Sequence, residues 1–313
     1  MVGVEAVIDP GLALVVGLAA AAMLEAAVGE PPARLHPVAW LGRAIGWLER
    51  RRFGAPRLVG CVYAIAVPTG CALVAYAVVA AAGAGPIPAL APVVAGVVLW
   101  VSSSLRMLLE RGREVIASSE TDIGAARESL LALAGRDAAE LSPGLVRSAA
   151  LESLAENLSD GFVAPLSAFV VLSFLSLPAA AAGAAFVKGA NTMDSMLGYP
   201  GPFGWGSARL DDLVMFVPAR LSAACLGFGS GNPDAPFRAR RYASKPASPN
   251  AGWPMGTLAA ALNVRLEKPG AYVLNEVAGY PTVADGDRAI AAVRRAAAVA
   301  SIAGVVVGVV RWL

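Results

Sequence analysis

Long runs of apolar residues alternate along this chain with stretches in which charged side chains are frequent. Four runs are long enough to cross a bilayer as helices, because about 20 apolar residues span its hydrocarbon core. They are Gly11–Val28, Leu58–Ala82, Ile87–Leu105 and Ala296–Leu313. The pattern predicts an all-α integral membrane protein with about four to six transmembrane or re-entrant helices.

Composition supports this prediction. The mean hydropathy is +0.63, and 57% of the residues are hydrophobic against 15% charged, which is far from the balance of a water-soluble domain. A net charge of +2 is too small to indicate a nucleic-acid partner. The three cysteines, Cys61, Cys71 and Cys225, lie in apolar segments without metal-ligand spacing, so we interpret them as buried hydrophobic side chains.

The arginines predict how the chain is oriented. They cluster between the first two apolar runs, whereas the link around Gly83–Pro86 has no charge. Because cytoplasmic loops carry an excess of Lys and Arg, we expect the cluster inside and the link outside. The chain is therefore predicted to be a single membrane domain over 1–313. Its cytoplasmic loops would be 29–57, 106–161 and 229–290, with amphipathic helices in the second.

The segment Phe162–Val187 differs from the other apolar runs because Leu177-Pro178 interrupts it. We expect two short helices in a re-entrant hairpin, which would return Asp160 and Asp194 to the cytoplasmic face. Broken helices at membrane depth are tolerated where they line a polar cavity. The next predicted helix, Ser207–Gly227, carries four charged side chains and should be buried in the bundle or lie at the interface.

Three carboxylates are spaced as neighbours on a helix. Glu152, Glu156 and Asp160 are four residues apart, so a helix would place them on one face. Like charges at this spacing cost a few tenths of a kcal/mol per pair unless a cation neutralises them. A divalent cation is the natural partner, and structural ion pairs with arginines are the alternative. We take the three as candidate catalytic residues.

Amide and further carboxylate side chains follow in the same region. Oxygen ligands without His or Cys suit magnesium better than zinc. The predicted Mg²⁺ ligands are Asp160, Asp194, Asp211 and Asp212. The predicted substrate-binding residues are Arg209, Arg220, Asn157, Asn191, Asn250 and Trp253. The two arginines are chosen because guanidinium groups bind phosphate and carboxylate through paired hydrogen bonds.

His36 is the only histidine and is a further catalytic candidate, as a general base. A packing or hydrogen-bonding role in its loop is the favoured interpretation of this residue taken by itself. Asn250 and Trp253 lie in a loop rich in Pro and Asn that suits either a ligand or a linker. The sequence contains no P-loop and no nucleophile elbow, so any ATP would be bound in another way.

Short motifs occur along the chain in an order typical of one enzyme family. They are Gly29-Glu30-Pro31, His36-Pro37-Val38, Gly42, Gly135-Arg136-Asp137, Glu152-Ser153, Ala155-Glu156-Asn157, Asp160-Gly161, Ala164-Pro165-Leu166, Asn191–Met196, Gly198-Tyr199, Phe203-Gly204, Ala208–Asp212, Pro218-Ala219-Arg220 and Ser248–Gly252. With them the chain resembles, over nearly its whole length, the cobinamide(-phosphate) synthases of cobalamin biosynthesis, called CobD or CbiB. It departs at Glu30, where Asp is more frequent, and at Ala138, where Thr is usual.

The resemblance implies a multi-pass enzyme of the inner (cytoplasmic) membrane with its active site on the cytoplasmic side. Such an enzyme is an ATP-dependent amide-forming (C–N) ligase that uses Mg²⁺. It joins adenosylcobyric acid to (R)-1-amino-2-propanol or its O-phosphate, and Asn250 and Trp253 would lie near one of these substrates. The implied partners are the two substrates, the lipid bilayer, and either a second copy of the chain or other corrinoid-pathway membrane enzymes.

Two other functions are weighed against this one. A magnesium-dependent intramembrane prenyltransferase also uses helical faces rich in Asn and Asp, but such proteins usually have many more spans than four. A non-enzymatic membrane transporter would line its solute path with intramembrane charges, but the inverted repeats typical of transporters are not found in this sequence.

Overall fold

The computed structural model describes residues 8–51, 54–134, 138–198 and 201–313. The motif Gly135-Arg136-Asp137 and Tyr199 lie outside the described residues. Helices make up nearly all of the regular structure. Among the described residues, four helical segments are long and apolar enough to cross a membrane: Pro10–Ala27, Pro56–Gly83, Pro88–Thr121 and Val283–Trp312. A bent pair of helices, Trp205–Val214 and Phe216–Gly229, would be a fifth if it counts as one span. The predicted class, an all-α membrane protein, is confirmed.

The chain forms two compact units, each described here by itself. The first contains Met1–Ser103, Pro165–Asp211 and Ser301–Leu313, and the second contains Ser104–Ala164 and Asp212–Ala300. Two of the three stretches predicted as cytoplasmic loops, 106–161 and 229–290, fall in the second unit. Which side of the membrane they face stays a prediction.

Helices make up the first unit. They are α1 (Pro10–Ala27), α2 (Pro37–Glu49), α3 (Pro56–Gly83), the 3₁₀ turn η1 (Pro88–Leu90), α4 (Ala91–Val101), α8 (Ala164–Leu172, from Pro165 on), α9 (Leu177–Leu197), most of α10 (Trp205–Val214) and the end of α14 (Val283–Trp312). Asp9, His36 and Ser176 cap helices that have proline in the first turn. Proline costs no hydrogen bond there, and the capping side chain accepts from the next free N–H groups.

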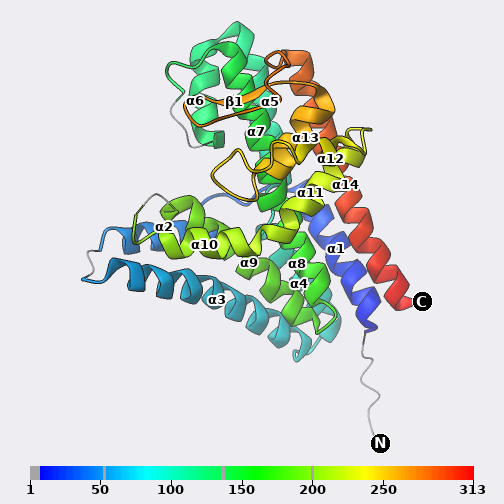
Figure 1. Ribbon diagram of the computed structural model, residues 1–313. Helices are drawn as coiled ribbons and strands as arrows, with labels where there is room; N and C mark the ends of the chain where they lie inside the picture. Colours follow the sequence, from blue (N-terminus) through cyan, green and yellow to red (C-terminus); the bar gives the residue numbers. More distant parts are fainter. Residues whose placement is uncertain (1–7, 52–53, 135–137, 199–200) are drawn as a thin grey trace, which may run out of the picture. The chain divides into compact units, whose positions relative to one another are not determined.

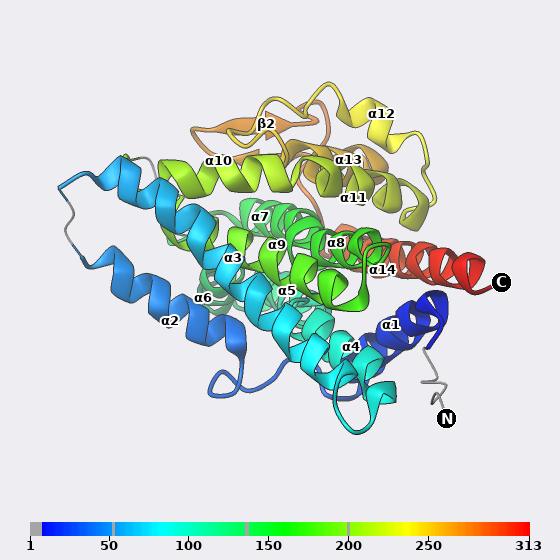
Figure 2. The same cartoon turned by 90° about the horizontal axis from the view of Figure 1, so that it is seen from below.

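Small residues let these helices approach closely. A Cβ at Gly96 of α4 would come within 2.4 Å of the carbonyl oxygen of Gly17 on α1. The two helices lie side by side (Figure 2), as α9 and α3 do in Figure 1. Such contacts are the usual basis of helix packing in membranes, where burial of apolar surface gives no driving force between helices.

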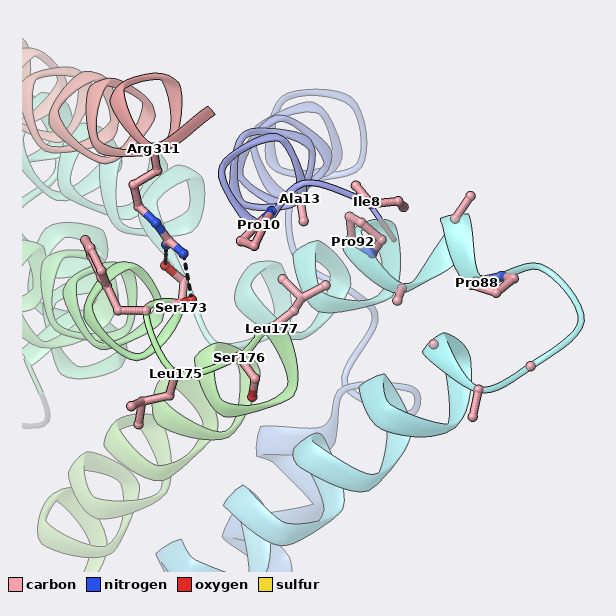
Figure 3. A pocket seen from close by; sticks show the side chains of 16 residues that line it. Ile8, Pro10, Ala13, Pro88, Pro92, Ser173, Leu175, Ser176, Leu177 and Arg311 are labelled. Carbon is pink, nitrogen blue, oxygen red and sulfur yellow. Dashed lines mark hydrogen bonds between the residues drawn. The ribbon is translucent and has the colours of Figure 1, made fainter. Parts of the chain in front are cut away.

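Helices α8 and α9 form the predicted hairpin, with the break at residues 173–176 and the proline after Leu177 in the first turn of α9. The turn, residues 173–176, lines a pocket of about 930 Å³ together with the link 83–85 and the start of α1 (Figure 3). Arg311 donates to Ser173 Oγ over 2.8 Å in this pocket. Since α9 has 21 residues, or about 30 Å, it is long enough to cross the hydrocarbon core. Whether the hairpin is re-entrant stays a prediction.

The single helix predicted over Ser207–Gly227 is wrong. The structure has α10 up to Val214 and then α11 (Phe216–Gly229), with a break at Met215. Pro218 lacks the N–H that would bond to the carbonyl of Val214, so the helical ladder is interrupted one turn before the proline.

The second unit has its own hydrophobic core. Its elements are α5 (Leu105–Thr121), α6 (Ile123–Ala134), α7 (Pro143–Leu158), the π-helical turn η2 (Ser159–Val163), α11, α12 (Ala235–Ala239), α13 (Gly252–Leu262), the antiparallel strands β1 (Leu266–Lys268) and β2 (Tyr272–Leu274), and most of α14. Leu130, Leu151, Leu154 and Leu258 are fully buried in the core. Since α7 is buried on most of its faces and lies against β1, its polar residues are drawn into the interior (Figure 1).

Candidate functional site

Helix α7 and the π turn that follows it carry the three predicted catalytic carboxylates. Glu152 is buried, whereas Glu156 and Asp160 are half-buried and accessible to a ligand. Asp160 lies inside the π turn, a rare structure that is frequent at functional sites. Beside it, the hydroxyl of Ser159 is buried without a hydrogen-bond partner in the described part of the chain. A bound water, ion or ligand is the usual explanation for such a group.

Glu152 is held in a cluster of hydrogen bonds. Its Oε1 accepts from Ser148 Oγ (3.1 Å) and its Oε2 from the hydroxyl of Tyr272 (2.9 Å). Ser148 Oγ in turn accepts from the N–H of Glu267 (2.7 Å). The carboxylate therefore links α7 to the β1–β2 hairpin, and the bonds offset the cost of burying it.

Three of the predicted substrate-binding residues lie together in the second unit. Arg220 Nη1 donates to Asn250 Oδ1 (2.9 Å) and to the carbonyl of Phe216 (2.6 Å). The guanidinium also lies over the rings of Phe216 and Trp253, at 3.6 and 5.1 Å from their centroids. Asn250 Nδ2 donates to the carbonyl of Asp212 (2.7 Å). We call Arg220, Asn250 and Trp253 the Arg220 cluster.

The Arg220 cluster is suited to holding an anion. Both of the side-chain hydrogen bonds of Arg220 come from Nη1, so the guanidinium keeps further N–H donors. A planar guanidinium fixed in this way can form paired hydrogen bonds with a carboxylate or a phosphate.

The other three predicted substrate-binding residues lie elsewhere. Asn157, on α7 of the same unit, donates from Nδ2 to the carbonyl and the hydroxyl oxygen of Ser153, both at 3.0 Å. Asn191 is half-buried on α9, and Arg209 is exposed on α10; both belong to the first unit.

The predicted metal ligands are divided between the units. Asp194 and Asp211 belong to the first, and Asp160 and Asp212 to the second. Among the described residues, no three His, Cys, Asp or Glu side chains come together in a group that could hold a metal ion. Magnesium commonly takes one or two carboxylates and completes its shell with water and substrate phosphates. The described residues thus show no preformed site with three such ligands, and the four aspartates stay predicted ligands.

The position of the Asp194 side chain explains why residue 198, in the motif Gly198-Tyr199, is a glycine. Its Oδ1 lies over Gly198, where a Cβ would come within 2.1 Å of that oxygen. The N–H of Gly198 donates to the carbonyl of Asp194 (2.7 Å), so the end of α9 is folded tightly around this carboxylate. Any larger residue at 198 would have to displace it.

His36 is the N-cap of α2. Its Nδ1 accepts from the N–H of Val38 (3.2 Å), and its Nε2 lies 3.6 Å from Glu30 Oε2. Because Nδ1 is an acceptor, the hydrogen-bond pattern assigns the proton of the neutral ring to Nε2, facing Glu30. A general-base role would require one of these two contacts to be given up.

Burial and charge shift the pKa values of this pair. Burial lowers the pKa of His36, and the positive charge of Lys188 lowers it further. Burial raises the pKa of Glu30, and Glu25 adds to the rise while Lys188 opposes it. The ring is therefore biased towards its neutral form.

Comparisons with known proteins address the family directly. The family model described as "CobD/Cbib protein" matches residues 18–301 of this chain. The chain belongs to the CobD/Cbib family. The resemblance expected from the ordered motifs is thus confirmed.

Curated relatives cover most of the chain. The "Cobalamin biosynthesis protein CobD" of Rhodobacter capsulatus is 38% identical over 305 residues, covering 88% of this chain and 91% of the relative. That of Mycobacterium tuberculosis is 38% identical over 286 residues, covering 87% and 86%. The "Probable cobalamin biosynthesis protein CobD" of Methanothermobacter thermautotrophicus is 37% identical over 266 residues, covering 82% and 85%. No solved structure matches the chain.

Several polar residues of this CobD/Cbib chain were not chosen from the sequence. Lys188 carried a usable signal, because a charged side chain within an apolar helix of a membrane protein is a candidate functional residue. Tyr272 carried none, since 120 residues separate it from Glu152 and only the tertiary fold brings them together. Ser148 is one helical turn before Glu152 and could have been chosen by that spacing.

Replacing His36 with Asn should make melting of the protein less sensitive to acid. Asn is also a good N-cap but does not titrate. Because the pKa of His36 is lowered in the folded state, its stabilising contribution is complete above the usual value of 6.5 and is lost as the pH falls through the folded value. Glu30 acts in the opposite sense, since its raised pKa means that its contribution is lost as the pH rises.

The measurement is the melting temperature of both proteins in detergent between about pH 8 and about pH 5. Glu30, Glu25 and Lys188 are present in both proteins, so the difference between the curves isolates the histidine. His36→Ala removes the cap as well, so it should be about 1 kcal/mol less stable than His36→Asn at every pH. If the melting temperatures of the wild type and His36→Asn depend on pH in the same way, the lowered pKa of His36 is contradicted.

Proposed function

We propose that this protein is an enzyme of cobalamin biosynthesis that forms an amide bond with ATP as co-substrate. It joins the free propionate carboxylate of adenosylcobyric acid to the amine of (R)-1-amino-2-propanol or of its O-phosphate. The observation that carries the proposal is the 37–38% identity to curated cobalamin biosynthesis proteins over most of both chains. The ordered family motifs support the same reaction.

Amide formation from a carboxylate needs activation, because the carboxylate oxygen is a poor leaving group. The carboxylate attacks the γ-phosphorus of ATP, releasing ADP and forming an acyl phosphate. The amine then attacks the acyl carbon, inorganic phosphate leaves with the bonding electron pair, and a protein base takes the amine proton. Mg²⁺ bound with ATP would neutralise phosphate charge, with Asp160 and Asp194 as the proposed ligands.

The Arg220 cluster is the proposed anion-binding element of this reaction. Asn250 and two aromatic rings already hold the guanidinium, so little conformational freedom is lost when an anion binds. Hydrogen bonds aimed at the transferring group stabilise the charge that develops on it. We place a substrate phosphate or carboxylate against Arg220.

The carboxylates of α7 divide into two proposed roles. Glu156 and Asp160 are half-buried and serve as proton acceptor and metal-phosphate ligand. Glu152 is buried and bonded to Ser148 and Tyr272, so it positions the helix from which the other two project.

Replacing Asp160 with Asn should raise the Mg²⁺ concentration required for half-maximal turnover by about tenfold or more, because a charged ligand becomes neutral. Asp194→Asn, measured separately, tests in the same way whether Asp194 of the first unit is a Mg²⁺ ligand. Asp234→Asn is the matched control, since Asp234 is exposed and makes no capping bond at α12. An unchanged Mg²⁺ dependence in both variants would remove these residues from the metal assignment.

A product assay tests the function. Membranes that contain the protein receive adenosylcobyric acid, ATP and Mg²⁺ with either amine, and the corrinoids are analysed by mass spectrometry. The expected product is heavier by one amide-linked aminopropanol or aminopropanol phosphate, and the preferred amine identifies the substrate. If folded protein yields no new corrinoid with either amine, the proposal fails.

A further inference from the structure

An apolar cavity of about 540 Å³ lies in the first unit between α2, α3, α4 and α9. Among the described residues that line it, Lys188 is the only charged one and the great majority are aliphatic. Val74, Val78 and Val97 line the cavity and are also exposed on the surface. The cavity therefore opens sideways from α3 and α4, two helices of the apolar spans, whose exposed surface faces lipid.

Helix α2 forms the edge of the cavity and has the character of an interfacial helix. Leu41 lines the cavity, while Trp40 and Trp47 are exposed on the other face of the helix. The guanidinium of Arg51 lies 4.2 Å from the ring centroid of Trp47. Exposed tryptophans and arginines on an amphipathic helix are typical of the membrane–water interface. The cavity thus extends from the interface into the apolar spans.

Lys188 lies where the cavity meets polar surroundings. It lines the cavity from α9, and its charge also acts on Glu30 and His36 in the link before α2. A lysine side chain has an apolar stem and a cationic end, so it suits a position between apolar and polar surroundings. An amphiphile with its chain in the cavity would bring its anionic group to this ammonium.

We propose that this cavity binds an anionic phospholipid, with one acyl chain between α3 and α4 and its phosphate at Lys188. The volume and the apolar lining with a single charged group are those of a ligand site. Basic pockets between membrane helices on the cytoplasmic side are typical sites for anionic headgroups. The site is independent of the amide reaction.

The chain offers two variants that test the cavity and the charge separately. Gly70 lines the cavity and is exposed, and a Cβ there would meet nothing within 4 Å, so Gly70→Leu adds an apolar side chain at the mouth of the cavity with room at its Cβ. Lys188→Gln removes the charge and keeps most of the stem. Lys268→Gln is the matched control, because Lys268 is exposed on β1 of the second unit.

Each purified protein is incubated with equal amounts of phosphatidylglycerol and phosphatidylcholine of the same acyl chains, and retained lipid is measured by native mass spectrometry. The wild type and Lys268→Gln should retain phosphatidylglycerol in roughly fivefold excess. Lys188→Gln should lose this preference, and Gly70→Leu should retain less of both lipids.

Three results would overturn the proposal: equal retention of both lipids by the wild type, an unchanged preference in Lys188→Gln, or undiminished retention in Gly70→Leu. Melting curves recorded for every variant establish that the protein is folded. Should Lys188→Gln fail to fold, Gly70→Leu still tests the same cavity without altering Lys188.

Discussion

Arg220→Lys should lower kcat/KM for amide formation by about 10²-fold while the protein remains folded. Lysine keeps the positive charge but has no planar guanidinium. It therefore cannot bond to Asn250 Oδ1, lie over Phe216 and Trp253, and present paired donors to an anion at the same time. The measurement is the initial rate of corrinoid product formation against the concentration of each substrate.

Two further variants test whether the loss of kcat/KM is specific to Arg220. Arg241→Lys, at an exposed arginine of the same unit, should turn over like the wild type. The kcat/KM of Asn250→Ala should lie between those of Arg220→Lys and Arg241→Lys. In this variant Arg220 keeps its contacts with Phe216 and Trp253 but loses its hydrogen bond to Asn250. If Arg220→Lys retains the wild-type kcat/KM, the Arg220 cluster is not the anion-binding element.

Glu152→Ala should destabilise the protein by about 3 kcal/mol. The substitution removes a buried acceptor and leaves the hydroxyls of Ser148 and Tyr272 without it in the interior of the second unit. It also removes the link between α7 and the β1–β2 hairpin. The measurement is the thermal unfolding of the purified variant in detergent, with the wild type alongside.

Glu152→Gln separates the structural role from a chemical one. The amide keeps the shape and one acceptor oxygen. If Glu152 only positions α7, the turnover rate of Glu152→Gln should fall no further than its loss of stability explains. Tyr272→Phe and the double variant Glu152→Ala/Tyr272→Phe complete a cycle whose coupling should be about 1 kcal/mol or more. A Glu152→Ala protein that melts like the wild type would show that the cluster contributes no stability.

The sequence predicted those parts of the fold that depend on local interactions. Two of the apolar spans, Pro10–Ala27 and Pro56–Gly83, are found within a few residues of their predicted ends. The last span ends close to its predicted end, but its helix begins at Val283 and not at the predicted Ala296, because charged residues of the second unit continue the same helix. The break predicted at Leu177-Pro178 is found just before these residues, and it is also local, because the Ser176 cap and the proline act within the first turn of α9. At Pro218 the same rule applied, but the helix was predicted to run unbroken from Ser207 to Gly227.

The remaining features depend on contacts between distant residues. No periodicity indicated that 104–164 and 212–300 would share one core. For the candidate site, the motifs of the family singled out Arg220 and Asn250, yet only the fold shows that they are hydrogen-bonded across 30 residues. His36 was chosen as the lone histidine, whereas its partner Glu30 and the nearby Lys188 became apparent from burial and charge.

The most direct measurement follows ¹⁸O from the reacting carboxylate of adenosylcobyric acid during turnover with ATP and the amine. The account predicts one ADP and one amide per turnover, with one ¹⁸O of the carboxylate in inorganic phosphate and the other in the amide carbonyl. Label in AMP would instead indicate an acyl adenylate, and an absence of both labelled phosphate and new amide would contradict an amide-forming role for this protein.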